Sequence, residues 1–469
     1  MKNPLVPSWL SENKDLEALD SAIWPATAKR NDRGELEIGG VSAPELVRQY
    51  GSPLYVVDQS DFESRLAEVR DAFESAAAKA GTSVKLYYAS KALLTTDVAR
   101  WVVSAGYAID VSTGGELAVA LAGGTEGERL GLHGNNKSLV EIGRAVSADV
   151  SAIVIDSEIE IERIASIAGA QDKKVQPVRL RVNSGVHAST HEYLATARED
   201  QKFGIALDDV PQMVEKIRSH SHLRFLGLHS HIGSQIFAVE GFVAAAEKLL
   251  EVHAELLAGG EVPELNLGGG FGIRYTAADE PMPIAELASQ IVSAVSKKCA
   301  ALSIAVPKLA FEPGRIIAGP AGVTLYSVGT TKDVVIAESG EGASRRYVSV
   351  DGGMSDNIRP ALYGAEYSAA IASRTSNSSG VLSRVVGKHC ESGDIVVRHE
   401  MLPDDLAVND LLAVPATGAY CYSLSSNYNF LPRPALVAVK DGKARALVRA
   451  ESEQDLLERD LGYQPGGGE

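Results

Sequence analysis

The stretch "VKLYYASKALLTTDVARWVVSAG" (residues 84–106) carries the pattern on which the fold prediction depends. Its first part is a short apolar run, and its second part has the spacing of an amphipathic helix. Lys91 stands between the two parts, directly after the apolar run. Lysine is rarely buried without a partner, so its place at the end of a buried strand points to a special role.

This strand-then-helix pattern occurs eight times from residue 84 to about residue 320. Each strand candidate is apolar throughout rather than alternating, as is typical of a parallel sheet covered on both faces. Eight such units favour a (β/α)8 TIM barrel of the α/β class over a doubly wound open sheet. The strand candidates are 84–90, 107–112, 128–134, 151–157, 177–183, 223–234, 264–272 and 308–315.

The sequence after about residue 320 has a different residue pattern and predicts a second, all-β C-terminal domain. It contains many short β-rich runs and few helical patterns, and Asp441-Gly442 is typical of a two-residue hairpin turn. The strand-like stretch at 35–43 precedes the barrel and is expected to join this sheet. The predicted parts are thus an N-terminal segment (1–51), the barrel (52–320) and the all-β domain (321–469).

Composition limits the class of protein. The chain has 469 residues and a net charge of −16, which argues against nucleic acid and against anionic membranes as partners. Its three cysteines are too few for a disulfide framework and lack the spacing of a zinc site, so we expect no metal. The first residues resemble no signal peptide and no apolar run is long enough to cross a bilayer, so we expect a cytoplasmic protein.

Polar residues gather where the predicted strands end, which in a barrel is the active-site face. A lysine there can form an imine, and a glycine run after the seventh strand can cradle a phosphate. A flat histidine can stack on a ring, and an acid can hold a proton on a ring nitrogen. Together these features indicate pyridoxal phosphate. The strand-end residues are Lys91, Asp110, Ser112, His133, Asn135, Asn136, Arg181, Asn183, His229, His231, Ser234, Gly268, Gly269, Gly270, Glu312 and Arg315.

Longer motifs make the assignment more specific. "YYASKA" (87–92), "HIGSQ" (231–235), "LGGGFG" (267–272) and "EPGR" (312–315) resemble the barrel-type pyridoxal-phosphate decarboxylases, the family of the ornithine, arginine and diaminopimelate decarboxylases. "GNNKS" (134–138), "RPALYGA" (359–365), "CESGD" (390–394) and "GAYCYS" (418–423) are most similar to the diaminopimelate branch of that family. The resemblance runs from about Pro53 to Ala435.

The resemblance implies a role for each matching residue. For the cofactor, Lys91 would carry it as an imine, His231 would stack on its ring and Glu312 would meet its ring nitrogen. Its phosphate would be surrounded by Ser234, Gly268, Gly269, Gly270, Gly314 and Arg315, with Tyr420 nearby. The substrate would be held by Arg315, Arg359, Tyr363, Glu391 and Tyr420. Cys390 would be the proton donor, offered to the site of a partner subunit in a homodimer with shared active sites.

The implied reaction is decarboxylation of meso-2,6-diaminopimelate to L-lysine and CO2, the last step of lysine biosynthesis. A decarboxylase of ornithine, arginine or carboxynorspermidine is the nearest alternative. "CESGD" with "RPALYGA" favours diaminopimelate, because its distal carboxylate calls for arginine and tyrosine as well as an acid. A racemase is disfavoured by the acid at Glu312, and a non-catalytic cofactor carrier would leave Arg359 and Cys390 without a purpose. The loop segments 136–137 and 184–202 receive no role.

Overall fold

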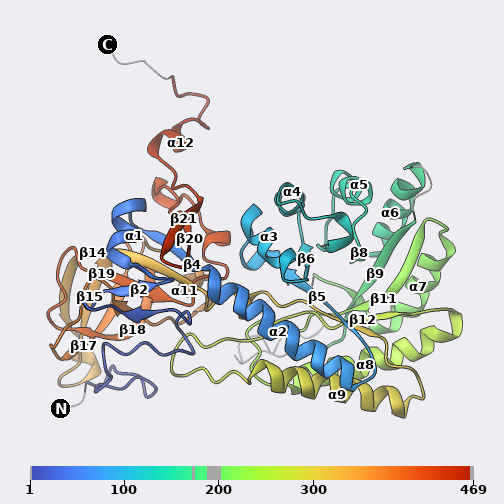
Figure 1. Ribbon diagram of the computed structural model, residues 1–469, viewed down its shortest axis with the longest axis horizontal. Coiled ribbons are helices and arrows are strands. Elements are labelled where there is room, and N and C mark those ends of the chain that lie inside the picture. The colour runs from blue at the N-terminus through green and yellow to red at the C-terminus, as the bar shows by residue number, and fades with distance from the viewer. Residues whose placement is uncertain (1–2, 172–174, 187–201, 465–469) are drawn as a thin grey trace. The chain divides into compact units, whose positions relative to one another are not determined.

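The computed structural model describes residues 3–171, 175–186 and 202–464. Contacts divide the chain into two compact units (Figure 1). One unit comprises Glu63–Ile273 and Pro281–Ile317, and the other comprises Met1–Phe62, Arg274–Glu280 and Ala318–Glu469. We describe each unit by itself.

The first unit is a closed barrel of eight parallel strands, as the repeated strand–helix pattern predicts. Neighbouring strands pair in parallel around the ring, and the pairing of β8 with β9 closes it. A two-residue strand, β10 (Ile205–Ala206), adds to β9 outside the ring. The barrel strands are β5 (Val84–Ala89), β6 (Ala108–Val111), β7 (Leu130–Leu132), β8 (Ala152–Ile155), β9 (Gln176–Asn183), β11 (Leu223–His229), β12 (Glu264–Asn266) and β13 (Lys308–Phe311).

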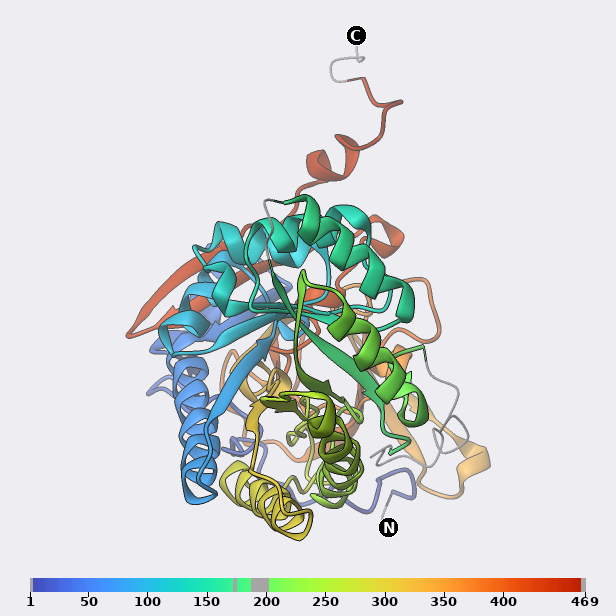
Figure 2. The same cartoon turned by 90° about the vertical axis from the view of Figure 1, so that its right-hand side faces the viewer.

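Helices surround these strands (Figure 2). The helices begin where the sequence supplies capping side chains: Thr95 and Thr113 cap α3 and α4, and Ser138 with Glu141 forms a capping box on α5. On α2, the Phe73 ring lies 4.1 Å from the ring of Phe311 at the end of β13. The helices are α2 (Gln59–Lys79), α3 (Thr96–Ser104), α4 (Gly114–Ala122), α5 (Leu139–Ser147), α6 (Glu158–Ala170), α7 (Val210–Ser219), α8 (Glu240–Leu256), α9 (Ile284–Ala301) and the short α10 (Arg315–Ala318).

The second unit is built on a large sheet with the strand order β18-β17-β15-β14-β4-β20-β21, and β19 links β14 to β16. Asp441 and Gly442 both have positive φ angles and join β20 to β21, which confirms the predicted hairpin. The strands are β4 (Leu54–Asp58), β14 (Gly322–Val335), β15 (Ser344–Val350), β16 (Ala370–Ile371), β17 (Gly380–Val386), β18 (Ile395–Pro403), β19 (Leu411–Pro415), β20 (Ala435–Lys440) and β21 (Lys443–Val448). Three short helices accompany them: α1 (Ala43–Tyr50), α11 (Arg359–Tyr363) and α12 (Glu453–Leu457).

A longer N-terminal part of the chain belongs to this second unit than we expected. The stretch at 35–43 supplies β2 (Leu36–Ile38) and β3 (Val41–Ser42), which form a separate three-stranded sheet with β1 (Lys29–Arg30) instead of joining the large sheet as we expected. Leu36 N donates to Ala372 O at 2.9 Å. We expected the barrel to start at residue 52, but β4 pairs with β14 and β20, so the barrel unit starts at Glu63. Within the part of the chain that is described, we find no helix with the length and apolarity needed to cross a membrane.

Candidate active site

Lys91 lies directly after β5, in the single 3-10 turn Ser90–Ala92. Ser90 and Ala92 are buried, whereas the Lys91 side chain is exposed. The Lys91 side chain therefore emerges at the carboxyl end of the strand rather than within the barrel. That position leaves the Lys91 amine open to react with a ligand at the strand ends.

Glu312 is a buried acid at this end of the barrel, with 6% of its surface exposed. Asn266 Nδ2 donates to Glu312 Oε1 at 2.7 Å, and His229 Nε2 lies 3.1 Å from the same oxygen. His133 Nε2 lies 3.5 Å from it. Burial by itself would raise the pKa of the Glu312 carboxyl, but His229 and His133 hold it well below its ordinary value. The site therefore holds a buried carboxylate, as a cationic ring nitrogen requires.

Asp110, near the end of β6, has a pKa shifted in the opposite direction to that of Glu312. Its Oδ1 lies 3.2 Å from His133 Nε2. Burial and the negative charge of Glu312 raise the pKa of the Asp110 carboxyl well above its ordinary value. Two imidazoles and a carboxylate are also a common zinc set, but here Glu312 is already engaged by Asn266 and His229 at hydrogen-bond distances. We therefore interpret His133, His229 and Glu312 as a hydrogen-bonded cluster.

His231 is oriented by the glycine run. Gly269 N donates to His231 Nδ1 at 3.2 Å, which makes Nδ1 an acceptor and places the ring proton on Nε2. Desolvation, followed by the positive charge of Lys91, lowers the pKa of His231 to about 3. The ring is therefore neutral, and a neutral flat ring is suited to stacking.

The glycines of this run are required because other backbone segments lie close to each of them. A Cβ on Gly269 would lie 2.0 Å from the carbonyl oxygen of Glu312, and Gly268 and Gly270 have φ angles of +66° and +111°. A larger residue at Gly269 would push β12 away from β13, whereas Cβ atoms on Gly268 and Gly270 would meet the carbonyl oxygens of Ser230 and Gly233 in the segment after β11.

Hydrogen-bond donors suited to an anion lie close together on the segments that follow β11 and β13. Arg315 Nη2 donates to Ser234 Oγ at 2.8 Å, so a guanidinium and a hydroxyl converge. Arg315 follows Gly314, where a Cβ would crowd Ala89 on β5 at 3.0 Å. The Arg315 guanidinium, the Ser234 hydroxyl and the glycine-rich backbone fit a phosphate group. Lys91 and Glu312 fit the aldehyde and the ring nitrogen of pyridoxal phosphate.

The other predicted residues belong to the β-rich unit. Arg359 begins α11, is 5% exposed and donates to Tyr275 Oη at 2.9 Å and to Tyr367 Oη. Tyr363 ends the same helix and is exposed. Tyr420 is partly buried and has a φ angle of +70°.

Cys390 and Glu391 lie in the loop between β17 and β18, and both are exposed. Cys390 N donates to Asn429 Oδ1 at 3.3 Å, and His389 Nδ1 lies 3.3 Å from the same oxygen. His389 N donates to Asp394 Oδ2 at 2.8 Å. The loop is thus fixed from both sides while its thiol remains accessible.

Sequence reasoning missed Asn266 and gave no role to His133, His229 or Asp110. Lys137, which also had no role, donates to Glu160 Oε2 at 2.9 Å and to the carbonyls of Gly134 and Val154. This buried lysine therefore fixes the loop after β7. The other segment without a role, 184–202, lies mostly outside the described residues.

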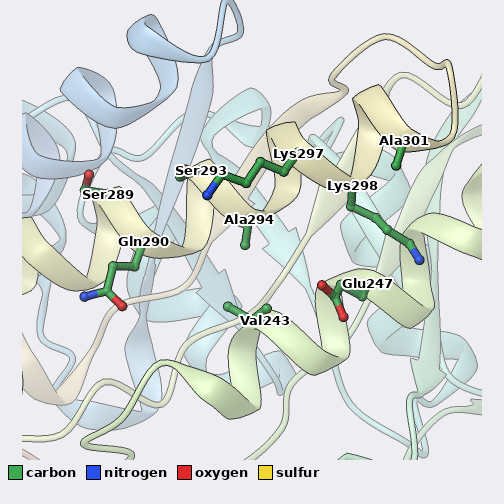
Figure 3. Close-up of a pocket in the computed structure, with 9 residues that line it drawn as sticks. All are labelled: Val243, Glu247, Ser289, Gln290, Ser293, Ala294, Lys297, Lys298 and Ala301. Atoms are coloured by element: carbon green, nitrogen blue, oxygen red, sulfur yellow. The ribbon is translucent and has the colours of Figure 1, made fainter.

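A groove of about 540 Å³ lies between α8 and α9, lined by residues such as Val243, Gln290 and Lys297 (Figure 3). It contains none of the strand-end residues. Small and flexible polar side chains line it, and nothing in it resembles the convergent groups around Glu312.

Comparison with known proteins agrees with this site. Residues 66–319 match the family model described as "Pyridoxal-dependent decarboxylase, pyridoxal binding domain". The diaminopimelate decarboxylase of Mycobacterium tuberculosis is 49% identical over 443 residues, which cover 93% of this chain and 97% of that protein. The Bacillus subtilis enzyme of the same name is 41% identical, over 94% of this chain and 98% of that protein.

Solved structures give the same result. Diaminopimelate decarboxylase from M. jannaschii in complex with L-lysine has a TM-score of 0.85 and 28% identity, covering 93% of this chain and 98% of that one. The Helicobacter pylori enzyme complexed with L-lysine has a TM-score of 0.78 and 27% identity, over 89% of this chain and 98% of that one. The fold and site define a pyridoxal-dependent decarboxylase. Within that class, the chain belongs to the diaminopimelate decarboxylase family.

Proposed function

We propose that this protein decarboxylates meso-2,6-diaminopimelate to L-lysine and CO2 with pyridoxal phosphate as its cofactor. In this reaction the bond from one α-carbon to its carboxylate breaks, CO2 leaves and a proton takes its place. The observation that carries the proposal is the buried Glu312 carboxylate, held by Asn266 and His229 beside the Lys91 strand end. Support comes from the family to which the chain belongs.

Each residue of the site is proposed to have a separate role in this reaction. Pyridoxal phosphate, when bound, supplies a ring into which the electron pair left by CO2 can spread. Lys91 would hold the cofactor, and Glu312 would keep a proton on its ring nitrogen. His231 covers the ring, while Arg315, Ser234 and the glycine run 268–270 bind the phosphate. Cys390 gives a proton to the carbon that lost CO2.

Specificity for a second carboxylate is proposed to come from Arg359. Its guanidinium is buried and donates to the hydroxyls of Tyr275 and Tyr367. A buried cation with neutral partners is suited to an anionic ligand group, because burial strengthens the attraction. Glu391 would meet the distal ammonium of the same substrate.

We further propose that the protein acts as a homodimer in the cytoplasm, with Cys390 and Glu391 serving the site of the partner subunit. Asn429, which holds the Cys390 loop, is flanked by Tyr428 and Phe430, whose side chains are 42% and 76% exposed. Exposed aromatic residues beside a reactive loop are typical of an interface. A second copy of the chain would cover them.

A direct test of specificity compares substrates by CO2 release. L-Ornithine and L-lysine lack the distal carboxylate and would leave the Arg359 cation unmatched. We expect their kcat/KM to be lower than that of meso-diaminopimelate by on the order of 10,000-fold. Comparable rates on ornithine and diaminopimelate would place the protein among the polyamine-forming decarboxylases.

Glu312→Gln should retain the cofactor and lose most activity. Glutamine keeps the size of the side chain but removes the negative charge that stabilises a protonated ring nitrogen. We expect kcat to fall about 100-fold or more, measured by CO2 release with the cofactor content determined in parallel. Glu264→Gln is the matched control, since Glu264 begins β12 and pairs with Arg179 away from Glu312. Near-normal turnover of Glu312→Gln would make Glu312 a structural residue.

A further inference from the structure

Asn266 connects two parts of the site that would otherwise be separate. It is the last residue of β12 and is fully buried. Its Nδ2 donates to Glu312 Oε1 at 2.7 Å, and its Oδ1 accepts from Gly268 N at 2.9 Å. One amide thus contacts both the acid for the ring nitrogen and the first glycine of the phosphate-binding run.

The orientation of this amide follows from its partners. Gly268 N can only donate, so Oδ1 must face it, and an ionised Glu312 can only accept, so Nδ2 must face that carboxylate. A flipped amide would lose both bonds, facing the Gly268 N–H with another donor and the Glu312 carboxylate with another acceptor. The backbone adds a further link, because Glu312 N donates to Gly268 O at 2.8 Å. Side chain and backbone therefore close a small ring of bonds between the ends of β12 and β13.

Asn266 differs from the other partners of Glu312 because its amide does not titrate. The remaining groups against this carboxylate are His229 and His133, with Asp110 beyond His133. Arg181 and His231 act on it or on its partners through their charge. Of these groups, only the Asn266 amide offers Glu312 Oε1 the same N–H donor at every pH at which the protein is folded.

We propose that Asn266 is a positioning residue that keeps Glu312 ionised and directed at the cofactor ring, and that ties this acid to the phosphate-binding glycines. The inference rests on the proposed role of Glu312. It predicts that Asn266 affects two properties of the bound cofactor: the pH dependence of its ring protonation through Nδ2, and its affinity through Oδ1.

Two substitutions separate these properties. Asn266→Leu removes both bonds while nearly keeping the volume of the side chain. Asn266→Asp keeps an acceptor for Gly268 N but replaces the donor facing Glu312 with an oxygen. We expect Asn266→Leu to bind pyridoxal phosphate roughly tenfold or more weakly, because a buried amide and a buried carboxylate each lose a partner. Asn266→Asp should stay nearer to the wild-type affinity.

The measurements are made on the cofactor-loaded, full-length protein without substrate. The absorbance of bound pyridoxal phosphate, which depends on its protonation state, is titrated with pH, and the dissociation constant is determined by equilibrium dialysis. Asn266→Leu should shift the spectral titration in the same direction as Glu312→Gln, whereas Asn266→Asp adds an acid beside Glu312 and should not shift it in that direction. Glu264→Gln, which alters a buried ion pair at the other end of β12, should leave spectrum and affinity unchanged.

Each outcome decides the question. Wild-type titrations and affinities in both Asn266 variants, with a shifted titration in Glu312→Gln, would overturn the role of Asn266 and leave the proposed function intact. An unshifted titration in Glu312→Gln would instead refute the role of Glu312. If both Asn266 variants fail to fold while Glu264→Gln folds, Asn266 is a structural residue and the positioning role is rejected.

Discussion

Lys91→Ala should lose nearly all decarboxylase activity, by roughly 1,000-fold or more, while the protein stays folded. The side chain is exposed at the end of β5 and its amine forms no part of the barrel core, so its removal should cost little stability. The same amine is proposed to hold the cofactor covalently and to exchange it with the amine of the substrate. Alanine cannot form that covalent bond.

The test combines activity with covalent labelling. Borohydride reduction of the wild-type protein should fix the cofactor on Lys91, as located by peptide mass spectrometry, and the Lys91→Ala protein should remain unlabelled. Lys85→Ala is the matched control, because Lys85 lies on the same strand but at its other end. Label on a different lysine, or full activity of Lys91→Ala, would refute the assignment of Lys91.

The barrel was predictable because its signal is local and repeated. Each strand is a short apolar run followed by a helical pattern, so eight consecutive units can be recognised without knowing which strands pair. Strand β4 was assigned to the wrong unit for the opposite reason. Its sequence "LYVVD" lies inside the predicted barrel range 52–320, and only pairing with β14 and β20, more than 260 residues away, places it in the other sheet.

The candidate site was predictable where a residue type carries the chemistry, as with Lys91, His231 and Glu312. The groups that hold those residues were not. Asn266 is the last residue of a buried strand, with nothing local to mark it, and its partner Glu312 is 46 residues further along the chain. The role of Lys137 could not be predicted for the same reason, because its counter-ion Glu160 lies 23 residues further along, on α6.

The second large effect concerns Cys390. Cys390→Ala should lower activity by about 100-fold to 10,000-fold, the usual contribution of a positioned proton donor. The thiol is exposed in the loop between β17 and β18, so the substitution should leave the fold intact. In the proposed homodimer, each site takes Lys91 from one subunit and Cys390 from the other.

Mixing the two inactive proteins therefore tests whether sites are shared. In a Lys91→Ala and Cys390→Ala heterodimer, one site carries both substitutions and the other carries neither. Random co-refolding in equal amounts should restore about a quarter of the wild-type activity, because half of the dimers are heterodimers and each of those has one intact site.

The matched control mixes Lys91→Ala with Glu312→Gln. Both residues belong to the barrel of a single chain, so every site in that heterodimer keeps one lesion and activity should not return. If Lys91 and Cys390 instead served the same site within one chain, the first mixture would behave like this control. Restoration in the first mixture and none in the second can arise only when the loop of one subunit completes the barrel site of its partner.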